Sequence, residues 1–125
     1  MRTYSFLDRL LITAQQGVEV CLRQADSVVK KSTLSQPIQK HSASLMRINH
    51  VGEVCAQGLY HGGALVAQSA EVRCMMEEAR LDEIPHLELL ERRLGQLSGR
   101  VSILNPFWYT TSLLMGLTAG WIGDE

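Results

Sequence analysis

Acidic side chains stand at matched distances on either side of a single break between two helical segments. Residues 45–67 and 71–97 both have helical character, and the small polar stretch at Gln68-Ser69 is the only break between them. If the chain folds back at this break, Glu53 lies fifteen residues before the turn and Glu83 fifteen residues after it. At roughly 1.5 Å per residue, each glutamate is then about 22 Å along its own helix. The spacing therefore predicts an antiparallel hairpin in which the two carboxylates meet at one height.

A histidine accompanies the second of these glutamates. His86 follows Glu83 by three residues, so the two side chains share one face of a helix and can reach a common ion. A Glu-x-x-His pair from one helix and a single Glu from its neighbour form the arrangement used by carboxylate-bridged di-iron bundles. Glu53, Glu83 and His86 are therefore candidate metal ligands, and together they amount to half of a two-metal site.

The inward face of the second helix is predicted to be apolar except at the proposed ligands. This face comprises Met76, Ala79, Glu83, His86, Leu87, Leu90, Leu94 and Leu97. Burying a lone carboxylate is very costly, so such a residue normally has a bound ion, a hydrogen-bonding partner or a raised pKa. The alternative interpretation is a core histidine with its hydrogen bonds satisfied, beside a glutamate turned toward solvent. The mirrored position of Glu53 gives the two interpretations about equal weight.

Composition limits the classes to which the chain can belong. With 125 residues, of which 46% are hydrophobic and 20% charged, the sequence forms one domain or part of one. The net charge of −1 and the absence of a basic cluster argue against a nucleic acid partner. Cys21, Cys55 and Cys74 have no paired spacing, which indicates free thiols used for packing in a reducing compartment.

The chain divides into three stretches. Residues 1–29 are predicted to form an N-terminal amphipathic helix, residues 30–44 a polar linker, and residues 45–125 the part that carries the ligands. A cleavable targeting segment is not expected, because the N-terminus lacks a long apolar run. Small residues in the 45–67 helix lower its helix propensity but permit close approach of a neighbouring helix. They are Gly52, Ala56, Gly58, Gly62, Gly63 and Ala64.

The stretch from Val101 to Gly123 contains no charged residue and is rich in aromatic and aliphatic side chains. Asn105-Pro106 interrupts it, in a pattern that predicts an N-cap followed by proline at the first helical position. The remaining helix is short for a bilayer span. A buried bundle helix and a helix lying in the membrane interface are both consistent with this composition.

Four sequence motifs, in order and spacing, closely resemble the demethoxyubiquinone hydroxylase family of ubiquinone biosynthesis. They are Leu45–Gln57 (LMRINHVGEVCAQ), Leu59–Gly62 (LYHG), Glu83–Leu87 (EIPHL) and Leu104–Tyr109 (LNPFWY). The resemblance covers most of the chain from about residue 43 onward. It implies an all-α, ferritin-like helical bundle, bound peripherally to the cytoplasmic side of a bacterial cell membrane. In such a bundle a two-iron centre uses dioxygen to hydroxylate the ring of a prenylated quinol, and residues 45–125 would form its first half.

The resemblance also implies roles for individual residues. Glu53 matches the terminal carboxylate of the first bundle helix, Glu83 the bridging carboxylate and His86 the imidazole ligand of the second. His50, one turn before Glu53, is a candidate outer partner that orients a ligand. Tyr60 and His61 are expected to be packing or surface residues.

This sequence departs from the family pattern in two ways. Pro85 lies between the paired ligands, where proline is expected to kink the helix or to cost about 3 kcal/mol. The family also supplies another Glu and another Glu-x-x-His on two later helices, and neither follows in this sequence. A fragment, an early stop or a degraded copy of a longer gene would each account for this difference.

With three ligands, catalysis would need either the missing half or a symmetric homodimer that brings two sets of three together. The alternative is a truncated, catalytically inactive, membrane-associated helical module that binds quinone or another ubiquinone-biosynthesis protein.

Overall fold

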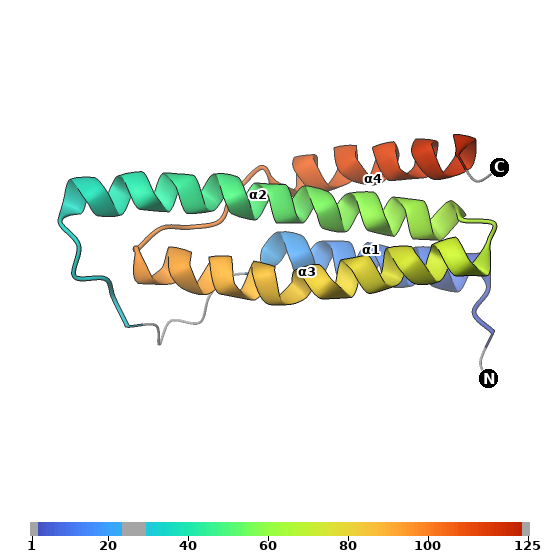
Figure 1. Ribbon diagram of the computed structural model, residues 1–125, viewed down its shortest axis with the longest axis horizontal. Helices are drawn as coiled ribbons and strands as arrows, with labels where there is room; N and C mark the ends of the chain where they lie inside the picture. The colour runs from blue at the N-terminus through green and yellow to red at the C-terminus, as the bar shows by residue number, and fades with distance from the viewer. Residues whose placement is uncertain (1–2, 24–29, 124–125) are drawn as a thin grey trace.

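The computed structural model describes residues 3–23 and 30–123. Within these ranges all regular secondary structure is α-helix, as the sequence predicts (Figure 1). The four helices are α1 (Phe6–Leu22), α2 (Gln36–Val66), α3 (Ala70–Gln96) and α4 (Asn105–Ile122). Helices α2 and α3 run antiparallel as the two longest elements, and α4 lies along α2 (Figure 1). Helix α1 packs against both α2 and α4.

The predicted hairpin turn is confirmed. Helix α2 ends at Val66 and α3 begins at Ala70. Ser69 is the N-cap of α3, and its hydroxyl accepts hydrogen bonds from the backbone N–H groups of Glu71 and Val72. A serine in this position satisfies backbone donors that have no partner inside the helix. The polar break between the two helices therefore also provides the N-cap of α3.

The boundary between linker and hairpin differs from the prediction. Helix α2 begins at Gln36 rather than at residue 45, so most of the polar stretch is helical. Pro37 fits the first turn of a helix, where its missing N–H has no partner to lose. Ala43 is buried against Leu94 and Leu97, and this packing holds the extra turns in place. Residues 24–29, expected to continue the N-terminal helix, lie outside the described residues.

Glycines set the distance between α2 and α4. A Cβ added to Gly58 would lie 2.5 Å from the carbonyl oxygen of Tyr109, and one added to Gly62 would collide with the carbonyl oxygen of Leu113. On the facing helix, a Cβ on Gly116 would collide with the carbonyl oxygen of Leu59. The two backbones are therefore in direct contact, as expected for helices rich in small residues.

Helix α4 starts one residue earlier than predicted from its capping pattern. Leu104 is the N-cap, and Asn105 is the first helical residue, fully buried. Within the described residues, no helix is both long enough and apolar enough to cross a membrane. Both α1 and α4 nevertheless expose large apolar side chains: Phe6, Leu7, Leu10, Leu11, Val18 and Leu22 on α1, and Phe107, Trp108, Leu114, Met115, Trp121 and Ile122 on α4.

Candidate metal centre

The hairpin brings the three proposed ligands together. Glu53 on α2 and Glu83 and His86 on α3 each offer one ligand atom, and these atoms all lie within 4.8 Å of one another. Matching distances from the turn therefore do place the two glutamates at one height. The Nδ1 atom of His86 lies 2.8 Å from Oε2 of Glu83, across one turn of α3. One ion could bind all three side chains after small rotations.

The predicted inward face of α3 is wrong for the histidine. The side chain of His86 is 60% exposed and that of Glu83 is 22% exposed, so the group lies at the edge of the hairpin and not in its core. Leu87, Leu94 and Leu97 are buried, as predicted, and the buried face of α3 also includes Arg80 and Glu91, which were not predicted to lie there. Glu83 and His86 lie beside this buried face of α3, on a face that the other described helices leave open.

An open hollow of about 450 Å³ adjoins the ligands. Glu53 and His86 line it together with Ile48, Leu89 and Gly52. A Cβ added to Gly52 would meet nothing within 4 Å, so the surface beside the carboxylates is free of steric obstruction. The hollow gives small molecules access to the ligand atoms.

The three side chains shift one another's pKa values, and the pattern of these shifts favours binding of a cation. Burial raises the pKa of the Glu53 carboxyl, and its hydrogen bond with Glu83 and the negative charge of Glu83 raise it further. The pKa of Glu83 is lowered by hydrogen bonds with Glu53 and with His86. The pKa of His86 is raised by its hydrogen bond to Glu83. Two touching carboxyls need a proton between them, and a metal ion would take the place of that proton and of the imidazolium charge.

The proline between the ligands does not interrupt α3. The helix is continuous from Ala70 to Gln96 with Pro85 inside it, and Pro85 is exposed. Because Glu83 and His86 still meet, the expected disturbance does not separate the paired side chains.

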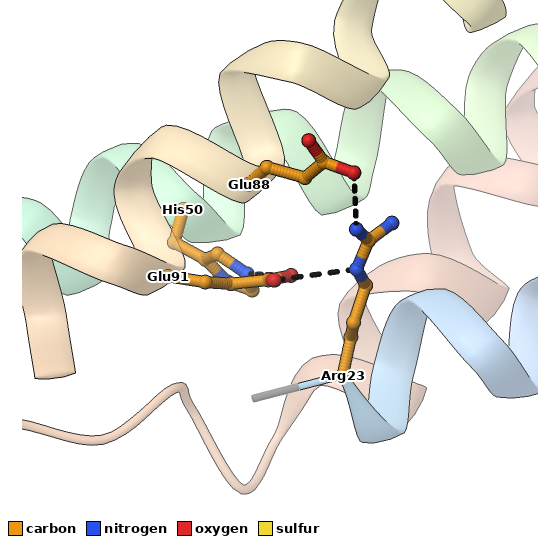
Figure 2. Close-up of polar contacts among 4 residues, drawn as sticks. All are labelled: Arg23, His50, Glu88 and Glu91. Atoms are coloured by element: carbon orange, nitrogen blue, oxygen red, sulfur yellow. Dashed lines mark hydrogen bonds and ion pairs between the residues drawn. The ribbon is translucent and has the colours of Figure 1, made fainter. Parts of the chain in front are cut away.

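A partly buried polar network that the sequence analysis missed joins three helices (Figure 2). Nη2 of Arg23 lies 2.7 Å from Oε1 of Glu88, and Nε of Arg23 lies 3.3 Å from Oε2 of Glu91. The other oxygen of Glu91 lies 3.5 Å from Nε2 of His50. Glu91 is 4% exposed and His50 is fully buried, so the network fixes the C-terminal end of α1 to the hairpin.

The position of Glu91 contains a signal that sequence reasoning can use. Glu91 lies four residues after Leu87 and three before Leu94, on the same apolar stripe, so helical spacing alone indicates a buried carboxylate there. His50, predicted as an outer partner of the ligands, has its Nε2 atom directed at Glu91 (Figure 2). Its Nδ1 atom is buried and has no hydrogen-bonding partner among the described residues.

Two further polar side chains pair inside the bundle. His61 on α2 is buried, and its Nδ1 atom shares a hydrogen bond with the hydroxyl of Tyr109 on α4. The rings meet edge to face, with centroids 5.8 Å apart. Burial lowers the pKa of His61 to about 4, and the positive charge of Arg80 acts in the same direction. His61 is thus a packing residue, as predicted, and it is neutral near pH 7.

We expect this histidine to make the fold sensitive to acid. The unfolded chain takes up a proton on His61 near pH 6.5, whereas the folded chain does so only near pH 4. The contribution of neutral His61 to the free energy of unfolding is therefore complete above pH 6.5. It is lost as the pH falls toward 4, by roughly 3 kcal/mol in all. Unfolding with urea at pH 7 and at pH 4.5 measures the loss. His61→Gln, whose amide can still form a hydrogen bond with Tyr109, should lose less stability between the two pH values. A His41→Gln control at an exposed position should behave like the unaltered chain. An unchanged pH dependence in His61→Gln would contradict the assignment.

The fold and the site define a class of protein: an all-helical bundle whose antiparallel hairpin presents a Glu, Glu, His group at one height. The family model described as ubiquinone biosynthesis protein COQ7 matches residues 40–125. The chain belongs to this family.

Curated relatives carry one printed name, 3-demethoxyubiquinol 3-hydroxylase. The relative from Pseudomonas syringae pv. syringae is 45% identical over 132 residues, which is 99% of this chain and 61% of the relative. The relative from Chromobacterium violaceum is 42% identical over 126 residues, or 95% of this chain and 61% of the relative. The relative from Legionella pneumophila strain Paris is 40% identical over 134 residues, or 100% of this chain and 63% of the relative. The chain thus spans about three fifths of the length of these relatives. No solved structure matches it.

Proposed function

We propose that this chain supplies half of the iron ligands of a monooxygenase that hydroxylates the ring of a demethoxyubiquinol intermediate in ubiquinone biosynthesis. The observation that carries the proposal is the convergence of Glu53, Glu83 and His86 across the hairpin. The printed activity of the relatives supports the choice of reaction.

The donor set fits iron. Two carboxylates and one imidazole, with an open side, form the mixed oxygen and nitrogen environment that suits iron sites which react with dioxygen. Bound iron would supply the activation of dioxygen. Glu53 and Glu83 would hold the metal and balance its charge, and His86 would contribute the nitrogen ligand. The adjoining hollow, lined by Ile48, Leu89 and Leu90, would receive an apolar ring beside the ligands.

Three ligands do not suffice for two irons. In the proposal, the remaining ligands come either from the rest of a longer protein or from a second copy of this chain, since two sets of three give six. The exposed position of the ligands, at an edge that the other described helices leave open, is compatible with either source.

The apolar surfaces of α1 and α4 support a peripheral position at a membrane, and the family resemblance suggests its cytoplasmic side. Each helix exposes a series of large apolar side chains, including Trp108 and Trp121 on α4, and aromatic residues of this kind favour the boundary between lipid and water.

We expect Glu83→Gln to weaken metal binding by roughly a hundredfold or more, because the substitution removes a charged ligand and the partner of His86. Titration of the purified chain with Fe²⁺ under anaerobic conditions, or with Co²⁺ followed by its absorption spectrum, measures the affinity. Glu88→Gln is the matched control, since Glu88 lies on the same helix, is exposed and is outside the ligand group. Equal affinities for the two variants would remove the ligand assignment.

Sedimentation of the metal-loaded chain tests the dimer. A dimer with bound metal supports the shared centre, whereas a strictly monomeric metal-bound chain excludes it. Formation of hydroxylated quinol, detected by mass spectrometry and absent in Glu83→Gln, tests the proposed activity itself.

The second candidate is a helical module that attaches to the membrane and binds quinone or another ubiquinone-biosynthesis protein without redox chemistry. The exposed apolar residues of α1 and α4 favour it, because they are present whether or not iron binds. Glu83→Ala separates the two functions. The module would be favoured if the variant bound lipid or partner as the unaltered chain does and neither of the two chains bound iron.

A further inference from the structure

The charged residues are divided unevenly between the two halves of the bundle. In the half where α2 begins and α3 finishes, the described residues 23, 30–50 and 88–106 contain eight Lys or Arg and two Glu (Figure 1). The other described residues contain three Arg and eight Asp or Glu. We call the first of these the basic end. The linear sequence has no basic cluster, so this polarity exists only because the fold brings distant segments together.

A pocket of about 640 Å³ opens at the basic end. Arg47 on α2 and Arg100 in the loop after α3 line it, and the described lining residues include no carboxylate. Nε of Arg47 donates a hydrogen bond to the backbone oxygen of Arg100 at 2.8 Å. This bond holds the guanidinium group of Arg47 beside Arg100. Within the described part of the chain, the terminal nitrogens of both guanidinium groups have no hydrogen-bonding partner and are available to an anion.

The same pocket has an apolar rim. Ile103 is 92% exposed and Leu22 is 70% exposed, and both line the pocket together with Leu104 and Pro106. Leu104 and Pro106 also belong to the start of α4, whose N-terminal dipole favours negative charge. Paired guanidinium groups beside exposed aliphatic side chains match a ligand with an anionic head and an apolar tail.

We propose that this pocket binds the phosphate of an anionic phospholipid headgroup, with the acyl chains lying over Leu22, Ile103 and Leu104. The inference rests on the peripheral membrane attachment proposed above and names the lipid that this attachment selects. Guanidinium groups pair with phosphate oxygens through charge-assisted hydrogen bonds. The pocket lies where the apolar surfaces of α1 and α4 meet the basic end, because Leu22 closes α1 and Leu104 opens α4.

Co-sedimentation with two kinds of vesicle tests the proposal. The purified chain is mixed with vesicles of phosphatidylcholine alone or of phosphatidylcholine with phosphatidylglycerol. We expect tighter binding to the anionic vesicles, weakened by salt. The double variant Arg47→Gln/Arg100→Gln should bind the anionic vesicles roughly 25-fold more weakly, at about fivefold for each cation removed, and the neutral vesicles as before.

A matched pair of cations separates a defined pocket from diffuse attraction. Arg92 and Arg93 are exposed at the same basic end and do not line the pocket, so Arg92→Gln/Arg93→Gln removes the same charge. We expect this pair to lose fivefold or less. Arg100→Gln alone keeps the hydrogen bond that Arg47 makes to the backbone, and it tests the pocket if the double variant fails to fold.

Several results would overturn the assignment. Equal losses for the two pairs would mean that charge alone attracts the chain, and equal binding to both vesicles would mean that the headgroup is not recognised. Complete displacement from the vesicles by inorganic phosphate at fixed ionic strength would make free phosphate the ligand. The ligand would be a nucleic acid if the chain bound an RNA oligonucleotide through Arg47 and Arg100 and did not bind vesicles. Absence of binding to either vesicle would also remove the proposed membrane attachment, whereas binding to both without preference would leave that attachment intact.

Discussion

Replacing Gly62 with leucine is expected to lower the free energy of unfolding by at least about 3 kcal/mol, a large part of what stabilises a domain of this size. A Cβ at this position would collide with the carbonyl oxygen of Leu113 and lie 2.8 Å from the backbone nitrogen of Leu117. These obstacles are backbone atoms of α4, which cannot move aside as a side chain can. Urea unfolding followed by circular dichroism measures the loss.

The same substitution at Gly52 provides the control. Gly52 lies in the same helix, ten residues earlier, and a Cβ there would meet nothing within 4 Å. Leucine is a much better helix former than glycine, so Gly52→Leu should raise the free energy of unfolding by up to about 1 kcal/mol. Opposite signs for the two variants would establish that helix contact, and not helix propensity, decides the first result. Similar stabilities would refute the close approach of α2 and α4.

The hairpin and the group of three side chains were predictable from the sequence because both depend on local quantities. A helix rises by a fixed amount per residue, so equal distances from Gln68-Ser69 bring Glu53 and Glu83 to one height whatever packs around them. A spacing of three residues likewise places His86 beside Glu83 in any helix.

Features that depend on partners elsewhere in the chain were not predictable in this way. The first turns of α2 look like a linker until Ala43 is seen against Leu94 and Leu97. The histidine was assigned to the inward face because periodicity gives the relative positions of side chains but not which stripe is covered, and the described helices cover the stripe of Leu87 and leave that of His86 open. The basic end has no counterpart in the linear sequence, since three separate segments supply its cations.

Glu91→Ala is expected to lower the free energy of unfolding by about 3 kcal/mol. The substitution leaves Nε2 of His50 buried without its partner and removes one of the two carboxylates that hold Arg23 (Figure 2). Removing one member of a buried ionic network is costly because the groups left behind were desolvated for a partner that is gone. Because Arg23 joins the end of α1 to α3, protection of α1 amides from hydrogen exchange should fall along with global stability.

Glu88→Ala separates burial from charge in this experiment. Glu88 makes the shorter contact to the same Arg23, at 2.7 Å against 3.3 Å for Glu91, but its side chain is 55% exposed, whereas that of Glu91 is 5% exposed. An exposed pair of this kind contributes at most about 1 kcal/mol, because water solvates both groups when the contact is broken. If distance governed the energy, Glu88→Ala would be the more damaging change; if burial governs it, Glu91→Ala is. Glu91→Gln, which keeps a hydrogen-bonding side chain of nearly the same shape, should lose less stability than Glu91→Ala. Equal losses for the two variants would mean that Arg23 requires the full negative charge and that α1 is held chiefly by electrostatics.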